Sequence, residues 1–199
     1  MPFAIAKKVG MTRVFDSEGK VFAATKLALL DLKVSQVLTE EKNGYNGVQV
    51  EFVPAPDKKN AKAKYSEFAT EDAKSYKAGD NVKFDLNSGD IIEVVGTGKG
   101  KGFAGVIKRH GFSRGPMGHG SNHHRAPGSI GGGYPQRVVA GRKMPGHLGA
   151  RQVMQKNLEI FDIDTNSGEI LIKGSIPGPK GSKIKISVIK KAETQESTN

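Results

Sequence analysis

The chain has 199 residues and carries 31 Lys and Arg against 20 Asp and Glu, giving a formal net charge of +11 and a pI of about 9.7. It contains no cysteine, which excludes a disulfide framework, a thiolate zinc site and a cysteine nucleophile. The apolar stretch Leu27–Leu30 is far below the roughly 20 residues of a membrane span, and Lys7 and Lys8 leave no room for a signal-peptide apolar region. We therefore expect a cytosolic or mature organellar protein without a membrane partner, whose excess charge points to a polyanion such as nucleic acid.

Short segments in which apolar and polar residues alternate predict β-strands on both sides of the chain's middle. In chain order the predicted strands are 3–6, 11–15, one from Val21 onward, 34–39, 48–53, 82–84, 91–95, 158–163, 169–173 and 184–188. Many short strands at close spacing are typical of a barrel or a sandwich, so we expect a mainly β protein. Residues 58–77 are rich in Ala, Lys and Glu and predict a helical insertion, and the polar residues 190–199 predict a frayed tail.

The positive charge is concentrated in one segment. No acidic residue occurs between Glu93 and Glu159, and this acid-free window, residues 94–158, holds eleven basic residues. The other 134 residues carry 20 basic and 20 acidic side chains, so the whole net charge belongs to the window. The window also holds 16 of the 26 glycines, all five histidines and six of the seven arginines. It is therefore a physically distinct part of the chain.

The window is not predicted to form regular structure, because its glycines disfavour a helix and Pro116, Pro127, Pro135 and Pro145 interrupt any long strand. A disordered linker is one interpretation. Apolar residues that linkers usually lack argue against it; they are Phe103, Val106, Ile107, Phe112, Ile130, Tyr134, Val138, Val139, Met144 and Leu148. We expect an extension with local structure that packs on something outside the protein.

Signals for a nucleotide site or a hydrolytic triad are weak. Gly100–Gly105 matches the dinucleotide-binding glycine pattern, but the ribose-binding acid expected about 20 residues later is missing before Glu159. Ser113, Ser121 and Ser129 have histidine neighbours in sequence, but the window supplies neither an orienting carboxylate nor a nucleophile-elbow motif. We expect no enzyme activity and no cofactor.

Signals for a metal site are also weak. His119, His123 and His124 lie close together in sequence, but the surrounding arginines would repel a cation and the window has no carboxylate. Residues 162–173 imitate a calcium loop in which the glycine falls one place late and Lys173 stands at the twelfth position, so a hairpin turn is the better interpretation. We expect no metal, and a metal-dependent hydrolase that uses the histidine cluster remains an alternative.

RNA binding fits the composition of the window best. Lys and Arg neutralise phosphates, Gly lets backbone amides approach them, and Phe112, Tyr134 and guanidinium planes can stack on unpaired bases. This mixture suits folded RNA better than uniform duplex DNA. A DNA-architectural or general polyanion-binding module is a further alternative.

Five segments, in order and spread over nearly the whole chain, resemble the universal ribosomal protein L-three family, of the bacterial type. They are Lys7–Phe15, Gly96–Arg109, His124–Gly131, Gly141–Gly149 and Lys173–Gly178.

At two places the sequence departs from the family pattern, and the family's features at those places are not carried over to this chain. The tip of the window has Gly and Tyr where some bacterial members carry a methylated Gln, so that methylation is not carried over to this chain. Gly98 stands where the family often has Ser or Thr.

The resemblance implies a translation-protein-type β-barrel with a small α/β insertion. It also implies a long irregular basic extension that threads into large-subunit ribosomal RNA toward the peptidyl transferase centre, with its tip near 131–136, and a role in early subunit assembly. On this basis we expect the barrel at 1–95 and 157–190 with a helical insertion at about 55–78. We expect the RNA-penetrating extension at 96–156 and a flexible tail at 191–199.

The charge pattern and the resemblance together predict the residues that contact RNA. Arg114, Arg125, Arg137, Arg142 and Lys143 are the strongest candidates for buried RNA contacts. The full predicted set is Lys7, Lys8, Arg13, Lys99, Lys101, Lys108, Arg109, Arg114, His119, His123, His124, Arg125, Tyr134, Arg137, Arg142, Lys143, His147 and Arg151. The expected partners are large-subunit rRNA and neighbouring large-subunit proteins, in the cytoplasm and without homo-oligomers.

Overall fold

The computed structural model describes residues 3–16, 18–54, 62–70, 73, 75–82, 84–164 and 167–191. The chain divides into two compact units, which we call the globular unit, residues 1–97 and 152–199, and the extension, residues 98–151. The globular unit contains β1 (Phe3–Phe15), β2 (Val21–Leu29), β3 (Leu32–Leu38), α1 (Glu40–Asn43), β4 (Gly47–Phe52), β5 (Lys64–Ala69), β6 (Ile91–Thr97), β9 (Gln152–Asp164), β10 (Glu169–Lys173) and β11 (Lys183–Lys190). The extension contains β7 (Phe103–Ala104), α2 (Val106–His110) and β8 (Gly146–His147).

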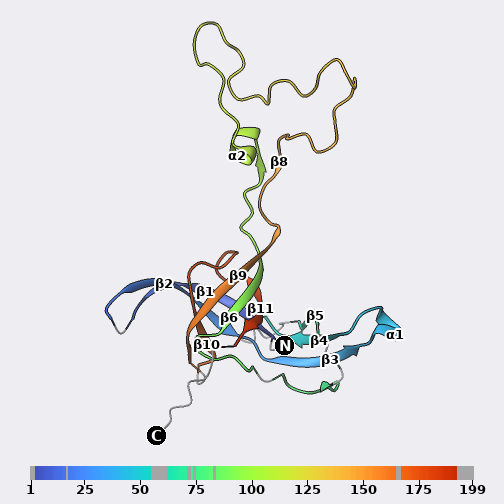
Figure 1. Cartoon of the computed structure of the whole chain (residues 1–199), viewed down its shortest axis with the longest axis vertical. Helices are drawn as coiled ribbons and strands as arrows, with labels where there is room; N and C mark the ends of the chain where they lie inside the picture. The colour runs from blue at the N-terminus through green and yellow to red at the C-terminus, as the bar shows by residue number, and fades with distance from the viewer. Residues whose placement is uncertain are drawn as a thin grey trace. The chain divides into compact units, whose positions relative to one another are not determined.

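Six strands of the globular unit form a closed barrel in the order β1-β11-β6-β9-β10-β2, in which all neighbours are antiparallel (Figure 1). Alternate residues of each strand point inward, as the period of two requires. The interior is filled by aliphatic side chains, namely Ala4, Ala6, Leu27, Ile92, Val94, Leu158, Ile160, Ile170, Ile172, Ile176, Ile184, Ile186 and Val188. The sequence-based prediction of a mainly β protein is confirmed.

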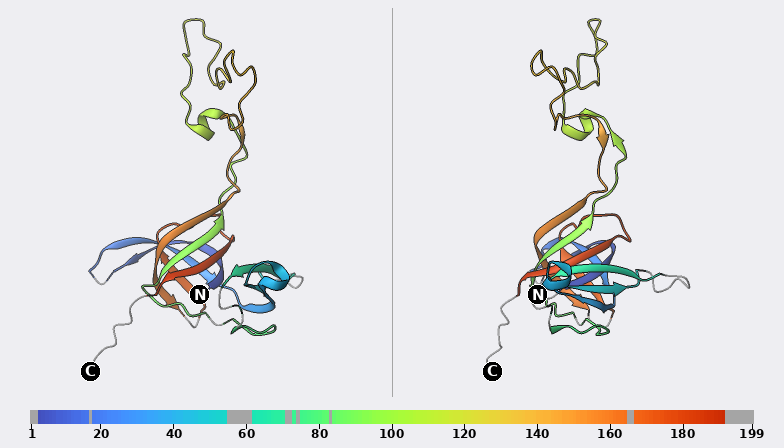
Figure 2. Two further views of the ribbon diagram at one scale, coloured as in Figure 1. Left: turned by 45° about the vertical axis from the view of Figure 1, so that its right-hand side comes forward. Right: turned by 90° about the vertical axis from the view of Figure 1, so that its right-hand side faces the viewer.

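A second core lies between the outer side of β1 and the antiparallel sheet β3-β4-β5 (Figure 2). Ala4 and Ala6 of β1 belong to the barrel core, whereas Phe3 and Ile5 belong to this second core. The ring of Phe3 stacks on Phe68 of β5 with centroids 4.4 Å apart. Strand β1 is therefore buried on both faces near its start, which explains its run of four consecutive buried residues.

The two strands predicted at 3–6 and 11–15 form one continuous strand, β1. Its register with β2 shifts between Lys8 and Gly10, where a β-bulge interrupts the alternation. The predicted strand at 82–84 is wrong for Val82 and Phe84, which lie outside the strands, and Lys83 lies outside the described residues. The backbone there makes only an isolated bridge between Asn81 and Lys33, although Val82 and Phe84 still pack on the second core.

The helix predicted over 58–77 is wrong for residues 64–69, which form strand β5, whereas Ala73 and Ser75 do lie in 3-10 helical turns. The Ala, Lys and Glu content favours a helix locally, but β5 pairs with β4 along its whole length, from Phe52 opposite Lys64 to Gly47 opposite Ala69. Ser66 and Phe68 are buried and Glu67 between them is exposed, so tertiary packing overrides the local propensity. Residues 55–61, 71, 72 and 74 of the prediction lie outside the described residues.

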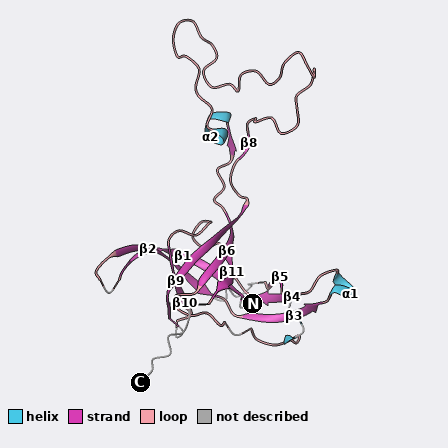
Figure 3. Ribbon diagram, viewed as in Figure 1, coloured by secondary structure: helices cyan, strands magenta, loops and turns pink. Residues whose placement is uncertain are grey.

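The extension is shorter than the predicted 96–156, because β6 continues to Thr97 and β9 already begins at Gln152, directly opposite it. Within residues 98–151, regular structure is confined to β7, α2 and β8, and the rest is drawn as loop (Figure 3). The predicted flexible tail lies outside the described residues except for Lys191. No helix in the described part of the chain has the length and apolar character of a membrane span.

The double burial of β1 generates a prediction about stability. Ile5 is 0% exposed in the second core, so Ile5→Ala should lower the free energy of unfolding by about 2–5 kcal/mol through lost burial and a cavity. Ile189→Ala on β11 is the matched control, because its side chain is 47% exposed, and it should change that energy by less than about 0.5 kcal/mol. Urea denaturation followed by circular dichroism measures both, and equal effects would contradict the two-core arrangement.

Candidate nucleic-acid interface

The extension combines high positive charge with little buried surface. Residues 98–151 contain ten basic side chains and no Asp or Glu. Ala104 and Val106 are the only buried residues of this segment, all of which the structure describes. A unit of this kind cannot be stabilised by a hydrophobic core of its own. Its fold rests on local hydrogen bonds, and its cations stay accessible.

The first and last residues of the extension are held together by backbone hydrogen bonds. The amide of Gly98 donates to Arg151 O (2.9 Å) and that of Lys101 to Leu148 O (2.8 Å). Strands β7 and β8 continue this antiparallel pairing. Gly149 is required here for two reasons: its φ is +79°, and a Cβ at this position would overlap the carbonyl oxygen of Lys99.

Helix α2 is fastened to the returning chain by two side chains that converge on one carbonyl. Arg109 Nη1 donates to Met144 O at 2.7 Å, and His110 Nε2 lies 3.0 Å from the same oxygen. Gly146 leaves room for the guanidinium, since a Cβ there would lie 2.7 Å from Arg109 Nη1. Arg109 is one of the predicted RNA contacts, but one of its guanidinium N–H groups already donates to a carbonyl inside the extension.

Further out, three local contacts shape the loops of the extension. His124 Nδ1 lies 2.8 Å from Pro116 O, and the amide of Gly115 donates to His124 O at 3.0 Å. Arg142 donates a hydrogen bond to Ser129 O. Of the predicted RNA-contacting residues, Arg142 and His124 therefore also have structural contacts.

The other predicted contact residues of the extension project from it without internal partners. Tyr134 is 92% exposed, which leaves its ring available for stacking. The side chains that are exposed and make no hydrogen bond or ion pair within the described part of the chain are those of Lys99, Lys101, Lys108, Arg114, His119, His123, Arg125, Arg137, Lys143, His147 and Arg151. The extension thus presents cations on several of its loops at once.

The three predicted contact residues of the globular unit have different surroundings. Arg13 is exposed and Lys7 is half-buried, whereas Lys8 is 8% exposed. The ammonium of Lys8 donates to Ile176 O (2.5 Å) and to Gly178 O (3.1 Å), and so fastens the loop before β11. We therefore assign Lys8 a structural role. The alternation of β1 could have revealed it, because Lys8 has the same parity as the inward-facing Ala4 and Ala6.

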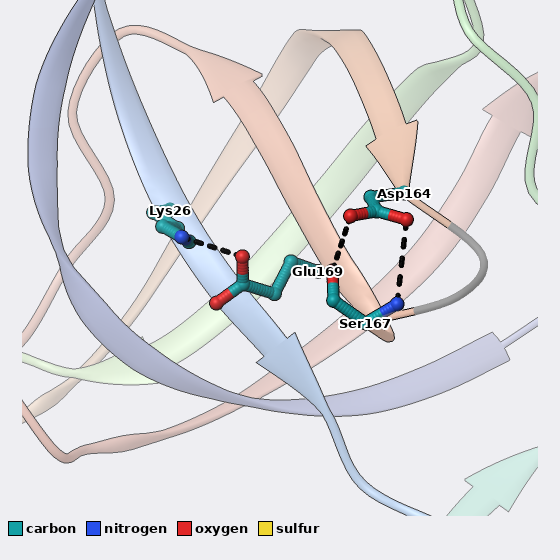
Figure 4. A network of polar contacts seen from close by, with 4 residues as sticks. All are labelled: Lys26, Asp164, Ser167 and Glu169. Carbon is teal, nitrogen blue, oxygen red and sulfur yellow. Dashed lines mark hydrogen bonds and ion pairs between the residues drawn. The ribbon is translucent and has the colours of Figure 1, made fainter.

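The structure offers little support for a metal centre. No group of three or more His, Cys, Asp or Glu that could hold a metal ion occurs among the described residues. Around the suspected calcium loop, Asp164 accepts hydrogen bonds from the amide (3.3 Å) and hydroxyl (2.6 Å) of Ser167, while Glu169 pairs with Lys26 (Figure 4). Asp164 thus makes contacts within the turn between β9 and β10, part of which, 165–166, lies outside the described residues, and Glu169 makes an ion pair with strand β2.

Comparison with known proteins identifies the family. The family model described as ribosomal protein L3 matches residues 58–170, which is more than half of the chain. The chain belongs to this family. It is 42% identical to the large ribosomal subunit protein uL3 of Desulfotalea psychrophila, over 92% of this chain and 95% of that protein. It is 43% identical to that of Spiroplasma kunkelii over 88% and 73%, and 42% identical to that of Alkaliphilus metalliredigens over 88% and 91%.

Membership of the ribosomal protein L3 family determines the general role of the chain. The family is structural and non-enzymatic, and its members are constituents of the large ribosomal subunit. The relatives are of the bacterial type. The accessible cations of the extension are therefore part of a ribosomal protein.

The structural role of Lys8 can be tested by Lys8→Met, which keeps the aliphatic stem and removes the ammonium. The carbonyls of Ile176 and Gly178 then lose the hydrogen bonds that they accept from the ammonium, so the free energy of unfolding should fall by about 1–3 kcal/mol. Lys33→Met on β3, where the lysine is exposed, is the control and should be nearly neutral. Equal urea midpoints for both variants would refute the structural assignment.

The role of Gly149 can be tested against a glycine of the same conformation. Gly149→Ala should loosen the base of the extension, whereas Gly141→Ala has the same backbone strain (φ +81°) but no atom within 4 Å of its Cβ. Hydrogen exchange at the Lys101 and Leu148 amides should therefore rise at least tenfold more in Gly149→Ala than in Gly141→Ala. Similar exchange in the two variants would show that the close approach to Lys99 is unimportant.

Proposed function

We propose that the extension binds folded large-subunit rRNA and that the globular unit anchors it within the ribosomal subunit. The proposal rests on the charge of residues 98–151, which include ten basic residues and no acidic residue. Most of these basic side chains have no hydrogen-bond or ion-pair partner within the described part of the chain. Such a surface repels itself until a polyanion neutralises it. Phosphates of converging RNA helices supply that neutralisation.

The composition of the extension favours RNA over a uniform duplex. Exposed arginines such as Arg114, Arg125 and Arg137 can pair with phosphates in a bidentate manner, and Tyr134 offers an exposed ring for an unpaired base. The many glycines let the backbone approach the RNA closely. A regular DNA duplex would instead favour a helix or a ribbon that fits one groove.

Membership of the ribosomal protein L3 family supports three finer parts of the proposal. We propose that the extension, with its tip near 131–136, points toward the peptidyl transferase centre, that the protein assists early assembly of the large subunit, and that the barrel is of the translation-protein type. Its other partners would be neighbouring large-subunit proteins rather than a second copy of the chain. Charge neutralisation supports an assembly role, because it lowers the repulsion between RNA segments that must come together.

The test replaces three cations of the extension. Arg114, Arg125 and Arg137 are exposed and make no internal contact, so changing all three to Gln should leave the fold intact. Binding to large-subunit rRNA should weaken by at least about 100-fold at 0.1 M KCl, and the slope of log K against log salt should fall by about two units, since each lost phosphate contact removes about 0.7–0.9. Filter binding between 50 and 200 mM KCl measures both quantities.

The matched control removes the same charge from the globular unit, by changing the exposed Lys42, Lys77 and Lys190 to Gln. Its slope should stay within about half a unit of the wild-type value. An extension variant that behaves like this control would overturn the proposal. Equal binding of wild-type protein to rRNA and to duplex DNA would favour a general polyanion-binding module instead.

A further inference from the structure

The globular unit contains a cavity of about 200 Å³ that is lined by three lysines, Lys7, Lys64 and Lys183. Its other lining residues are Leu30, Phe52, Pro54 and Gly181. We call it the lysine cavity. Among the described residues, no carboxylate lines it. Outside the extension, 21 basic residues stand against 20 acidic ones, so this local excess of one sign is not a property of the globular unit as a whole.

The fold itself brings the three lysines together. Lys7 of β1 lies directly opposite Lys183 of β11, on the outer side of the barrel that carries Phe3 and Ile5. Lys64 begins β5 and lies opposite Phe52 of β4, and the ammonium of Lys183 lies 5.2 Å from the centre of the Phe52 ring. Like charges directly opposite each other on neighbouring strands are unfavourable. Among the described residues, no acidic side chain compensates the positive charge of this site at the edge of the second core.

Neighbouring groups do not relieve this charge. Lys7, Lys64 and Lys183 form no ion pair within the described part of the chain. Glu67 of β5 accepts hydrogen bonds from the Tyr45 hydroxyl (2.8 Å) and the Gln49 amide (3.1 Å), which hold the pKa of its carboxyl below the usual value. Burial, and then the positive charge of Lys64, lower the pKa of Lys183. The negative charge of a bound anion would raise the pKa of Lys183 and so oppose both effects.

We propose that the lysine cavity binds one phosphate group of the rRNA backbone, as a contact separate from those of the extension. The cavity has room for a phosphate, and the ammonium groups of its three lysines can donate hydrogen bonds to the phosphate oxygens. Phe52 and Leu30 provide an apolar wall, where charge-assisted hydrogen bonds are stronger than in bulk water. The inference rests on the proposed function, because it takes RNA as the source of the phosphate.

The test uses the full-length chain with Lys7, Lys64 and Lys183 changed to Gln, and the Lys42, Lys77 and Lys190 variant as the control of equal charge. The cavity variant should bind large-subunit rRNA about tenfold more weakly than the control at 0.1 M KCl, and its salt slope should be lower by about one unit, as expected for one phosphate. Because Lys7 is half-buried, the single variant Lys64→Glu is compared with Lys42→Glu in case the triple variant does not fold. Lys64→Glu should show at least the same tenfold loss.

Equal affinities and slopes in the cavity and control variants would overturn the inference. A titration of wild-type protein with inorganic phosphate, against chloride at equal ionic strength, separates the two sources of phosphate. Nuclear magnetic resonance shifts at the three cavity lysines with no effect of the variants on rRNA binding would show a site for free phosphate, and would also overturn the inference.

The outcome is distinguishable from failure of the proposed function. If the variant of Arg114, Arg125 and Arg137 binds normally while the cavity variant is weakened, the role of the extension fails and the cavity contact stands. If only the extension variant is weakened, the cavity contact fails and the role of the extension stands.

Discussion

Strand β1 packs into two hydrophobic cores at once, and the arrangement of the globular unit depends on this. Ala4 and Ala6 face the barrel interior, and Phe3 and Ile5 face the sheet β3-β4-β5. Because side chains alternate along a strand, a shift of one residue in the register with β2 and β11 would exchange the two sets. The same alternation continues to the basic residues that follow. It places Lys8 inward, where two carbonyls accept hydrogen bonds from its ammonium, and Lys7 outward, in the lining of the lysine cavity.

Charge and burial are separated between the two units for a physical reason. An uncompensated cation is too costly to bury, so the ten basic residues of the extension occupy a segment with almost no buried surface. Where cations do enter the globular unit, they are compensated or kept at an edge. Lys8 binds backbone carbonyls, Lys26 pairs with Glu169, and the lysines of the cavity stay at the rim of the second core. The exposed cations belong to a member of the ribosomal protein L3 family, whose members are constituents of the large ribosomal subunit.

Backbone geometry, more than side-chain packing, gives the extension its order. Paired amides and carbonyls join its two ends, and Arg109 and His110 converge on the carbonyl of Met144. Glycine at 149 is needed for the close approach to Lys99. Such contacts hold a shape without using most of the cations, which explains how a segment with no core can be locally ordered and still keep its charge available for a partner.

The sequence by itself determined the mainly β class, most of the strands, the acid-free window and the family resemblance, because alternation, charge and motifs are local properties of the chain. It did not reveal that residues 64–69 form strand β5, since Ala, Lys and Glu favour a helix and only pairing with β4 decides otherwise. It placed Lys8 with the RNA contacts, although the barrel turns that ammonium inward. Tertiary structure alone brought Lys7, Lys64 and Lys183 to one cavity, because residues so far apart in sequence meet only when β1, β5 and β11 have packed around the second core.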